Sequence, residues 1–179
     1  VARSAFEEAL LEICHGLAVD IVRNGEGTDH VIAVAVDNAP EYNLGRAIGK
    51  AVVNSPLVKT AVFGNDPNVG RIVSSIGDFL GTYSPDVDVS QISISLGGEN
   101  IFRKGVFTLD QDKEARLVRY LTSCSLGKAN LSYPPHERNV EIEIDLHSSP
   151  AQSNASASAR VWGSDLTYAY IRENADYRS

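Results

Sequence analysis

Apolar residues at spacings of three and four in the first segment of the chain predict an amphipathic helix. Ser4 followed by Glu7 has the spacing of a capping box, and Asn24-Gly25 supplies an ending signal. The apolar positions that share one face are Phe6, Leu10, Ile13, Leu17 and Ile21. We therefore expect the chain to begin with a helix.

The next segment predicts a buried strand followed by a second helix. Residues 30–37 (HVIAVAVD) are apolar at almost every position and rich in β-branched side chains, which is typical of a strand covered on both faces. Asn38 and Glu41 have the spacing of another helix start. The apolar stripe of that helix consists of Leu44, Ala47, Ile48, Ala51 and Val52.

A central stretch at residues 54–71, NSPLVKTAVFGNDPNVGR, predicts a strand, a turn and a helix without a spacer. The apolar run at residues 57–63, with Lys59 inside it, indicates a short buried strand. Residues 64–68 form a polar turn, and a new apolar periodicity opens the next helix at Ile72, Val73 and Ile76. Ligands tend to bind at such junctions in open α/β folds, because helical N–H groups and turn side chains converge there. A purely structural turn is the alternative.

The second half of the chain has an antiparallel character. The alternating stretch QISISL at residues 91–96 predicts a strand whose inward residues are Ile92, Ile94 and Leu96. Gly97-Gly98 then turns the chain into IFRKGVF, which is expected to be an antiparallel partner. Asp110 is expected to cap a helix whose inward residues are Leu117, Val118 and Leu121.

The last third of the chain predicts two strands, two loops and a short helix. Alternation at residues 140–147 indicates a strand with one solvated face and with four inward residues, Val140, Ile142, Ile144 and Leu146. Residues 127–138 and 147–158 have the composition of loops. A final strand at residues 159–163 precedes Asp165, which is predicted to cap a helix. Three tyrosines are expected to pack this end down, Tyr168, Tyr170 and Tyr177.

Composition excludes several classes of function. With 179 residues and 43% hydrophobic side chains, the chain can bury a core, and residues 1–179 are predicted to form a single domain. A formal net charge of −7 and the lack of a basic stripe argue against a nucleic-acid partner. No apolar run approaches the length that spans a bilayer, and Glu7, Glu8 and Glu12 stand where a signal peptide would be uncharged. We therefore expect a soluble, intracellular protein with no membrane partner.

Residues with obvious chemistry form no complete catalytic constellation. The four histidines, His15, His30, His136 and His147, show no HExxH motif and no clustering with cysteine. Cys14 and Cys124 make no CxxC pair and are predicted to be buried thiols. No GxSxG nucleophile elbow occurs. The sequence predicts no metal site and no cofactor.

One acidic residue has an unusual setting, in the motif NGEG at residues 24–27. Glycine on both sides of Glu26 lets the backbone approach a ligand closely and leaves the carboxylate less shielded. The alternative is an ordinary helix end with a solvated glutamate.

Three separated motifs carry a resemblance to a known family: NGEG after the first helix, SPLVKTAVFGNDPNVGR in the middle and GSDLTYAYIRENADYRS at the end. Their order and spacing resemble the β chain of ornithine acetyltransferase, the glutamate N-acetyltransferase of the cyclic arginine pathway. The resemblance extends over nearly the whole chain, with residues 83–158 matching mainly in pattern. This chain is similar to the C-terminal part of that β chain.

The family resemblance implies a reaction, a fold and partners. A precursor of this family cleaves itself into α and β chains, and the freed N-terminal threonine of the β chain carries acetyl from N-acetylornithine to glutamate. The implied fold is α/β (α+β), a layered α-β-β-α-type sandwich with mixed sheets that a partner chain or upstream segment completes. The implied partners are the α chain and the upstream β segment, in an α2β2 heterotetramer without a cofactor. The implied location is cytoplasmic, with mitochondrial matrix or plastid as alternatives.

The resemblance also assigns site residues by position. Glu26 matches the family's substrate-binding acid, whose carboxylate would be buried and would pair with the α-ammonium group of the substrate. Asn174 matches the family's substrate-binding asparagine, and Ser179 stands where the family usually ends in threonine. Lys59 and Asp66 are second-tier candidates, for which a structural ion pair is the alternative.

Two departures from the family pattern affect the interpretation. The nucleophilic threonine is absent, because the chain begins at Val1, so it is expected upstream and no residue of this chain is predicted to be catalytic. Val69 replaces the tryptophan of the usual DPNWGR, which removes an aromatic contact. Two other classes stay open: a related self-processing amidohydrolase that releases acetate, and a non-catalytic family remnant that acts in binding or assembly.

Overall fold

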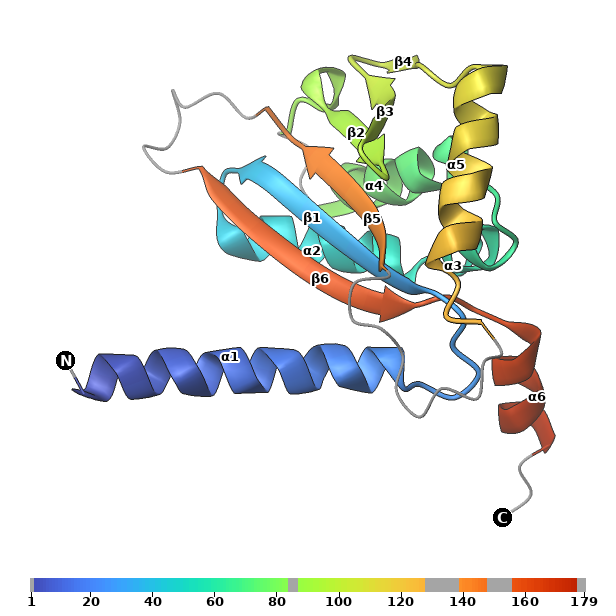
Figure 1. Cartoon of the computed structure of the whole chain (residues 1–179). Helices are drawn as coiled ribbons and strands as arrows, with labels where there is room; N and C mark the ends of the chain where they lie inside the picture. Colours follow the sequence, from blue (N-terminus) through green and yellow to red (C-terminus); the bar gives the residue numbers. More distant parts are fainter. Residues whose placement is uncertain (1, 84–86, 128–138, 148–155, 177–179) are drawn as a thin grey trace.

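A computed structural model describes residues 2–83, 87–127, 139–147 and 156–176 of the chain (Figure 1). Helices dominate the first half of the chain, and all strands except β1 lie in the second half. The elements in chain order are α1 (Ala2–Arg23), β1 (Val31–Ala39), α2 (Tyr42–Asn54), α3 (Pro56–Phe63), α4 (Val69–Tyr83), the 3-10 helix η1 (Val89–Gln91), β2 (Ser93–Leu96), β3 (Glu99–Arg103), β4 (Val106–Phe107), α5 (Gln111–Cys124), β5 (Asn139–Asp145), β6 (Ala157–Ser164) and α6 (Tyr168–Asp176).

The strands of the described residues form one mixed sheet with the order β4-β3-β2-β5-β1-β6. β1 and β5 run parallel at its centre, whereas β6 pairs with β1 and β2 pairs with β5 in antiparallel fashion. Gly97-Gly98 connects β2 to β3, and both glycines have positive φ, as the predicted hairpin requires. The expected mixed α/β layering is therefore confirmed.

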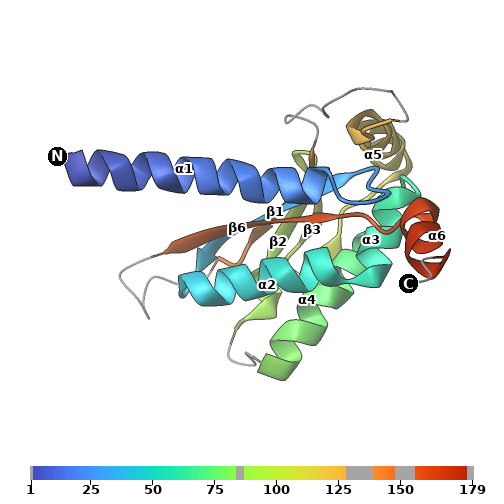
Figure 2. The same cartoon turned by 90° about the horizontal axis from the view of Figure 1, so that it is seen from below.

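One face of the sheet packs against α2 and α4 and forms the core (Figure 2). The central strands supply six of its fully buried side chains, Ile32, Val34, Val36, Val140, Ile142 and Ile144. Helix α2 approaches β6 so closely that a Cβ on Gly49 would lie 2.7 Å from a methyl group of Val161. Glycine at position 49 therefore permits the close packing of this helix on the strand.

Helix α1 lies on the opposite side of the sheet from α2 and α4 (Figure 2). It contacts β6 where the rings of His15 and Trp162 pack edge to face, with centroids 4.6 Å apart. The predicted apolar face of α1 is exposed, and we call its five residues the α1 apolar surface; they are Phe6, Leu10, Ile13, Leu17 and Ile21. Among the described residues, no helix combines the length and apolar composition needed to cross a membrane.

The sheet face on the α1 side carries polar and charged side chains. Arg160 of β6 forms an ion pair with Glu141 of β5, and its guanidinium lies 5.5 Å from the ring centroid of Trp162. Ser158 donates a hydrogen bond of 2.6 Å to Asp37 at the end of β1. The two faces of the sheet thus differ, because alternating residues of each strand point to opposite sides.

The predicted strand at residues 57–63 is wrong, because this run forms helix α3. Pro56 occupies the first turn, where its missing N–H is tolerated, and the Ser55 side chain accepts a hydrogen bond from the Val58 N–H. The buried residues follow a helical spacing of three and four, Val58, Ala61 and Val62. Periodicity alone cannot distinguish a helix from a strand in so short an apolar run. The order of the first half is therefore helix, strand, helix, helix, helix.

Three predicted helix caps are also wrong. Helix α1 already includes Ser4, whose hydroxyl bonds to Glu8 instead of capping the helix. Asn38 has φ 54° and donates a hydrogen bond to Asp145, so it does not cap α2. Asp165 does not cap α6, because its carboxylate is used elsewhere, as described below. Short polar side chains form local or distant hydrogen bonds, and sequence spacing does not distinguish the two.

The predictions for the second half are mostly confirmed. Asp110 caps α5 by accepting a hydrogen bond of 2.8 Å from the Lys113 N–H. The predicted inward residues of β2 and β5 are buried, as are Leu117 and Leu121 of α5. Val118 is 38% exposed, and Cys14 is exposed whereas Cys124 is buried. The burial predicted for Cys14 and Val118 is wrong because α1 and the outer side of α5 have little protein packed against them.

The C-terminal tyrosines are less packed than expected. The Tyr168 side chain is 75% exposed, although its ring packs edge to face on Phe63 with centroids 5.5 Å apart. Tyr170 is 44% exposed. Four parts of these predictions lie outside the described residues: Tyr177, His136, residues 128–138 of the first predicted loop and residues 148–155 of the second.

Candidate functional site

The loop that follows α1 is docked on the first turn of α6. The Thr167 hydroxyl donates a hydrogen bond of 2.6 Å to the Gly27 carbonyl and accepts one of 3.0 Å from the Tyr170 N–H. Gly27 has φ +65°, and a Cβ there would lie 2.4 Å from the Tyr170 backbone nitrogen. Positive φ and this close approach both require glycine. The NGEG motif and the C-terminal motif therefore form one structural unit.

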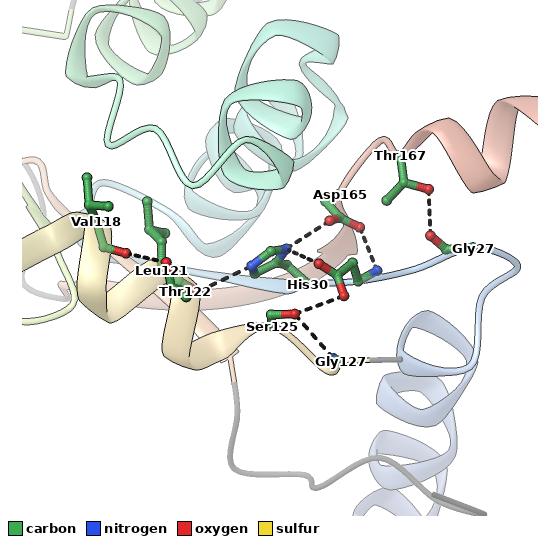
Figure 3. A network of polar contacts seen from close by, with 10 residues as sticks. Gly27, His30, Val118, Leu121, Thr122, Ser125, Gly127, Asp165 and Thr167 are labelled. Atoms are coloured by element: carbon green, nitrogen blue, oxygen red, sulfur yellow. Dashed lines mark hydrogen bonds and ion pairs between the residues drawn. The ribbon is translucent and has the colours of Figure 1, made fainter. Parts of the chain in front are cut away.

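His30 lies fully buried beside this unit and joins segments that are distant in sequence (Figure 3). Its Nδ1 lies 3.0 Å from Asp165 Oδ2, and its Nε2 lies 3.2 Å from the carbonyl oxygen of Leu121 on α5. The antiparallel register of β1 and β6 sets Val31 opposite Ser164. The next pair beyond the strand ends is His30 and Asp165, and the Asp165 N–H donates to the His30 carbonyl over 3.1 Å.

The neighbours of the ring indicate that His30 is an imidazolium. A carboxylate and a carbonyl oxygen only accept hydrogen bonds, so each ring nitrogen must carry a hydrogen to satisfy both. Burial by itself lowers the pKa of His30. The hydrogen bond and charge of Asp165, the charge of Asp29 and the Leu121 carbonyl outweigh burial and raise the pKa above its usual value of 6.5.

Asp29 extends the network to the end of α5. Its backbone N–H donates a hydrogen bond of 3.1 Å to Asp165 Oδ1, and its carboxylate accepts one of 2.9 Å from the Ser125 hydroxyl. The Leu126 N–H donates to the Asp29 carbonyl over 2.7 Å. These bonds tie the loop after α1, the end of α5 and the segment before α6 together.

Asp29, His30 and Asp165 are close enough to be considered as a metal site, because their donor atoms lie within 4.8 Å of one another. A histidine that binds a metal needs a free lone pair on one ring nitrogen. Both nitrogens of His30 face acceptors, so neither offers one. We therefore interpret these three residues, which we call the His30 cluster, as a buried hydrogen-bonded ion pair rather than metal ligands.

Two of the predicted substrate-binding residues lie on either side of the contact between Gly27 and Tyr170. Glu26 directly precedes Gly27 and is exposed rather than buried in the described part of the chain. Asn174 is exposed on α6, and its side-chain amide donates a hydrogen bond of 2.9 Å to the Tyr170 carbonyl. Ser179 lies outside the described residues. The structure thus brings Glu26 and Asn174 to the same end of the molecule.

The second-tier residues are separated from each other. Lys59 is partly buried on α3, and its carbonyl accepts a hydrogen bond of 3.4 Å from the Leu166 N–H, so α3 borders the segment before α6. Asp66 is exposed after α3, where its carboxylate accepts a hydrogen bond of 3.0 Å from Asn68. Within the described residues, no ion pair joins Lys59 to Asp66, so the alternative of a shared ion pair is excluded.

The DPNVGR motif has a clear structural role. The Asn68 side chain accepts a hydrogen bond of 3.2 Å from the Arg71 N–H at the start of α4. The Arg71 guanidinium donates to the Leu57 carbonyl over 2.9 Å and so fastens α4 to α3. Val69, which stands in place of the family's tryptophan, is 4% exposed and packs in the core. A cavity of about 310 Å³ adjoins this turn and is lined on its other side by Phe107, Leu109 and Glu114.

Sequence reasoning missed the His30 cluster and the role of Thr167. His30 was expected only as the first residue of a strand and Asp165 only as a helix cap. A signal did exist, because both residues are polar and directly flank apolar strands. It could be used only after β1 and β6 were known to be antiparallel neighbours.

Comparison with known proteins identifies relatives of this chain. A family model described as "ArgJ family" matches residues 1–179. An arginine biosynthesis bifunctional protein ArgJ from Lactococcus lactis subsp. lactis is 36% identical over 97% of this chain and 37% of its own length. A glutamate N-acetyltransferase from Methanopyrus kandleri is 37% identical over 100% of this chain and 40% of its own length.

A solved structure has the same fold. The crystal structure of the arginine biosynthesis bifunctional protein ArgJ from Bacillus halodurans matches with a TM-score of 0.77 and 32% sequence identity. The match covers 97% of this chain and 70% of that chain. Of the two curated relatives named above, this chain spans well under half the length, at 37% and 40%.

Proposed function

Because the chain belongs to the ArgJ family, we propose that it forms the substrate-recognition part of a glutamate N-acetyltransferase in arginine biosynthesis. The family membership that the three motifs predicted is confirmed. The observation that carries the proposal is the docking of the NGEG loop on α6, which brings Glu26 and Asn174 to one end of the molecule.

Glu26 is proposed to bind the α-ammonium group of the substrate. Its carboxylate is exposed and therefore available to a cation, and the docked loop restricts where it can lie. A charge-assisted hydrogen bond there would orient the substrate amide toward a nucleophile. Burial of this carboxylate, which the family resemblance implies, would then come from protein outside the described residues. Asn174 and Ser179 are proposed to contact the same substrate from the C-terminal segment.

The reaction is proposed to proceed through an acetyl-threonine ester on a residue outside this chain. The threonine oxygen attacks the acetyl carbonyl of N-acetylornithine, an ester C–O bond forms, and the amide C–N bond breaks. The amine of the departing ornithine takes the hydroxyl proton, relayed by the N-terminal amine or a nearby base. The amine of glutamate then attacks the ester and regenerates the threonine hydroxyl. Groups of the α chain are proposed to hold the oxyanion.

Protein that the longer family members contain beyond the part matched by this chain is proposed to cover the α1 side of the sheet. The α1 apolar surface is between 47% and 76% exposed at each of its five residues, and such an apolar patch usually marks an interface. The relatives are more than twice as long as this chain, so they contain further protein that could cover it. An α chain and an upstream β segment in an α2β2 assembly are the proposed occupants.

Intact-mass spectrometry of the natively purified protein, incubated with N-acetylornithine, tests the proposal. The expected result is a companion chain with an N-terminal threonine that gains one acetyl group and loses it to added glutamate. Release of free acetate without glutamate would instead support a related amidohydrolase. Absence of any acetylated chain would leave a non-catalytic role in binding or assembly, and the proposed function would be abandoned.

A further inference from the structure

The proposed function assigns no role to His30. This ionisable residue is fully buried, and it lies at the centre of the hydrogen-bond network that supports the candidate site. The acetyl-transfer scheme needs Glu26, Asn174 and a nucleophile from outside this chain. The ring of His30 is fully buried, and its neighbours are Asp165, Asp29 and the Leu121 carbonyl. Its contacts join the strand that leads out of the Glu26 loop to the segment that leads into α6.

We propose that His30 is a positioning residue, whose imidazolium fastens the loop that carries Glu26 to the segment that carries Asn174. The inference rests on the proposed function insofar as Glu26 and Asn174 bind substrate. The positional part stands on geometry alone. Asp165 Oδ2 binds the His30 ring, and Asp165 Oδ1 accepts from the Asp29 N–H over 3.1 Å, so one carboxylate spans both sides.

A neutral His30 could not maintain all of these contacts. One ring nitrogen would then present a lone pair either to the Asp165 carboxylate or to the Leu121 carbonyl, and both of these are acceptors. Loss of the positive charge would also leave the Asp165 carboxylate buried without its cation, which is costly. Proton loss from His30 is therefore expected to loosen Asp165 and, two residues along the chain, Thr167.

The charges around His30 come from two segments. Asp165 faces the ring from the segment before α6, and Asp29 lies 3.5 Å away on the loop side. From α5 the neighbouring groups are the Leu121 carbonyl and, through Asp29, the Ser125 hydroxyl, and neither is charged. From α3 the Lys59 carbonyl reaches this segment by bonding to Leu166. The local field is thus set by two carboxylates, which favour the imidazolium.

The direction of the pH effect follows from this arrangement. The pKa of His30 in the folded protein is raised above 6.5, so the contribution of the ion pair is fully present below pH 6.5. It is lost as the pH rises through the raised pKa. Substrate binding is expected to weaken over that pH range, whereas the chemical step is not, because the ring of His30 is fully buried and bonds to Asp165 and Leu121.

Steady-state kinetics as a function of pH, on the whole natural protein that contains this chain, tests the inference. In the wild type, KM for N-acetylornithine should rise about tenfold through the raised pKa while kcat changes little. His30→Gln should show the high KM at all pH values and lack the inflection. Asp165→Asn should move the inflection to lower pH, because it removes the charge that favours the imidazolium.

His147→Gln is the matched control. His147 is exposed and bonds to Ser93 and Asp145, outside the His30 cluster, so the same substitution there should leave KM and its pH dependence unchanged. An unchanged KM profile in His30→Gln, with wild-type kcat, would overturn the positioning role. A profile altered equally by both substitutions would also overturn it.

A readout that does not depend on activity separates this inference from the proposed function. NMR of ¹⁵N-labelled histidine, assigned with His30→Gln, should show both nitrogens of the His30 ring protonated below pH 6.5, and amide exchange at residues 25–29 and at Tyr170 should accelerate as this signal titrates. Both results in a protein without acetyltransferase activity would uphold the positioning role and reject only the proposed function. A ring that is neutral below pH 6.5 would overturn the inference even in an active enzyme.

Discussion

Gly27 is the residue on which the geometry of the candidate site depends most directly. Its positive φ turns the loop after α1, and its missing side chain lets the loop contact the backbone of α6. Backbone strain and steric exclusion act at the same position, so the site needs glycine for two separate reasons. No comparable conformational or steric requirement restricts the neighbouring position of Glu26. This is expected of a residue whose role is to bind a ligand.

Gly27→Ala is expected to destabilise the protein by about 2 to 4 kcal/mol, because positive φ and the 2.4 Å approach to the Tyr170 nitrogen act together. Chemical denaturation measures this free energy. Gly98→Ala is the matched control, since Gly98 has φ +78° with no atom within 4 Å of the added Cβ, and should cost only about 1 to 2 kcal/mol. Equal losses in the two variants would mean that the contact with α6 contributes nothing.

Glu26→Gln is expected to raise KM for N-acetylornithine or to abolish transfer, with an unchanged Tm. The Glu26 side chain is exposed, so removing its charge should affect a ligand and not the core. Kinetics and thermal unfolding on the same preparation check this. Glu41→Gln, an exposed glutamate before α2 at the other end of β1, should behave as the wild type. Wild-type kinetics in Glu26→Gln would reject its role in substrate binding.

At the scale of single elements, α6 has few contacts of its own with the rest of the protein. None of its nine residues is buried, and it is held through Thr167, Gly27 and the ring contact between Tyr168 and Phe63. A short, exposed helix is marginal in water unless it is capped and docked. The position of Asn174 therefore depends on one hydroxyl that both caps α6 and binds the Gly27 carbonyl.

Thr167→Val is expected to destabilise the protein by about 2 kcal/mol and to increase amide exchange throughout α6, because it removes a helix cap and a buried hydrogen bond at constant shape. Hydrogen exchange with mass spectrometry checks the location of the effect. Thr122→Val on α5 is the control, since the Thr122 hydroxyl bonds to the Val118 carbonyl of its own helix. Protection of α6 that survives Thr167→Val would contradict this account.

At the scale of the whole molecule, the two faces of the sheet have different chemistry. The face toward α2 and α4 buries a continuous apolar core, whereas the other face carries charged side chains beneath a helix with its apolar residues exposed. An exposed apolar surface of this kind usually marks an interface, which supports the proposal that further protein covers this face. That asymmetry agrees with a chain that spans only part of the length of its relatives.

Leu17→Asp in the whole natural protein is expected to weaken assembly, because a charge would be buried at the proposed interface. Native mass spectrometry at a series of concentrations should show dissociation of the companion chain. Leu57→Asp is the matched control, since Leu57 on α3 is 58% exposed, against 60% for Leu17, and lies outside the α1 apolar surface. An assembly equally stable in both variants would mean that the α1 apolar surface is not an interface.

Local features of the sequence determined much of this protein. The alternation at residues 91–96 and 140–146 determined strands with one buried side, and Asp110 determined a helix start, because these signals act over a few neighbouring residues. The three motifs indicated to which family the chain belongs.

Only the tertiary structure decided the properties that depend on distant residues. The run at residues 57–63 is compatible with a strand, and the packing of Val58, Ala61 and Val62 in the core made it a helix. His30 and Asp165 are 135 positions apart, and the antiparallel register of β1 and β6 brought them together. The exposure of the α1 apolar surface also had to be observed, because amphipathic patterning shows that a face is apolar but not what covers it. The free energies of strand pairing and of side-chain burial depend on contacts between distant segments. The sequence alone does not show which segments are in contact.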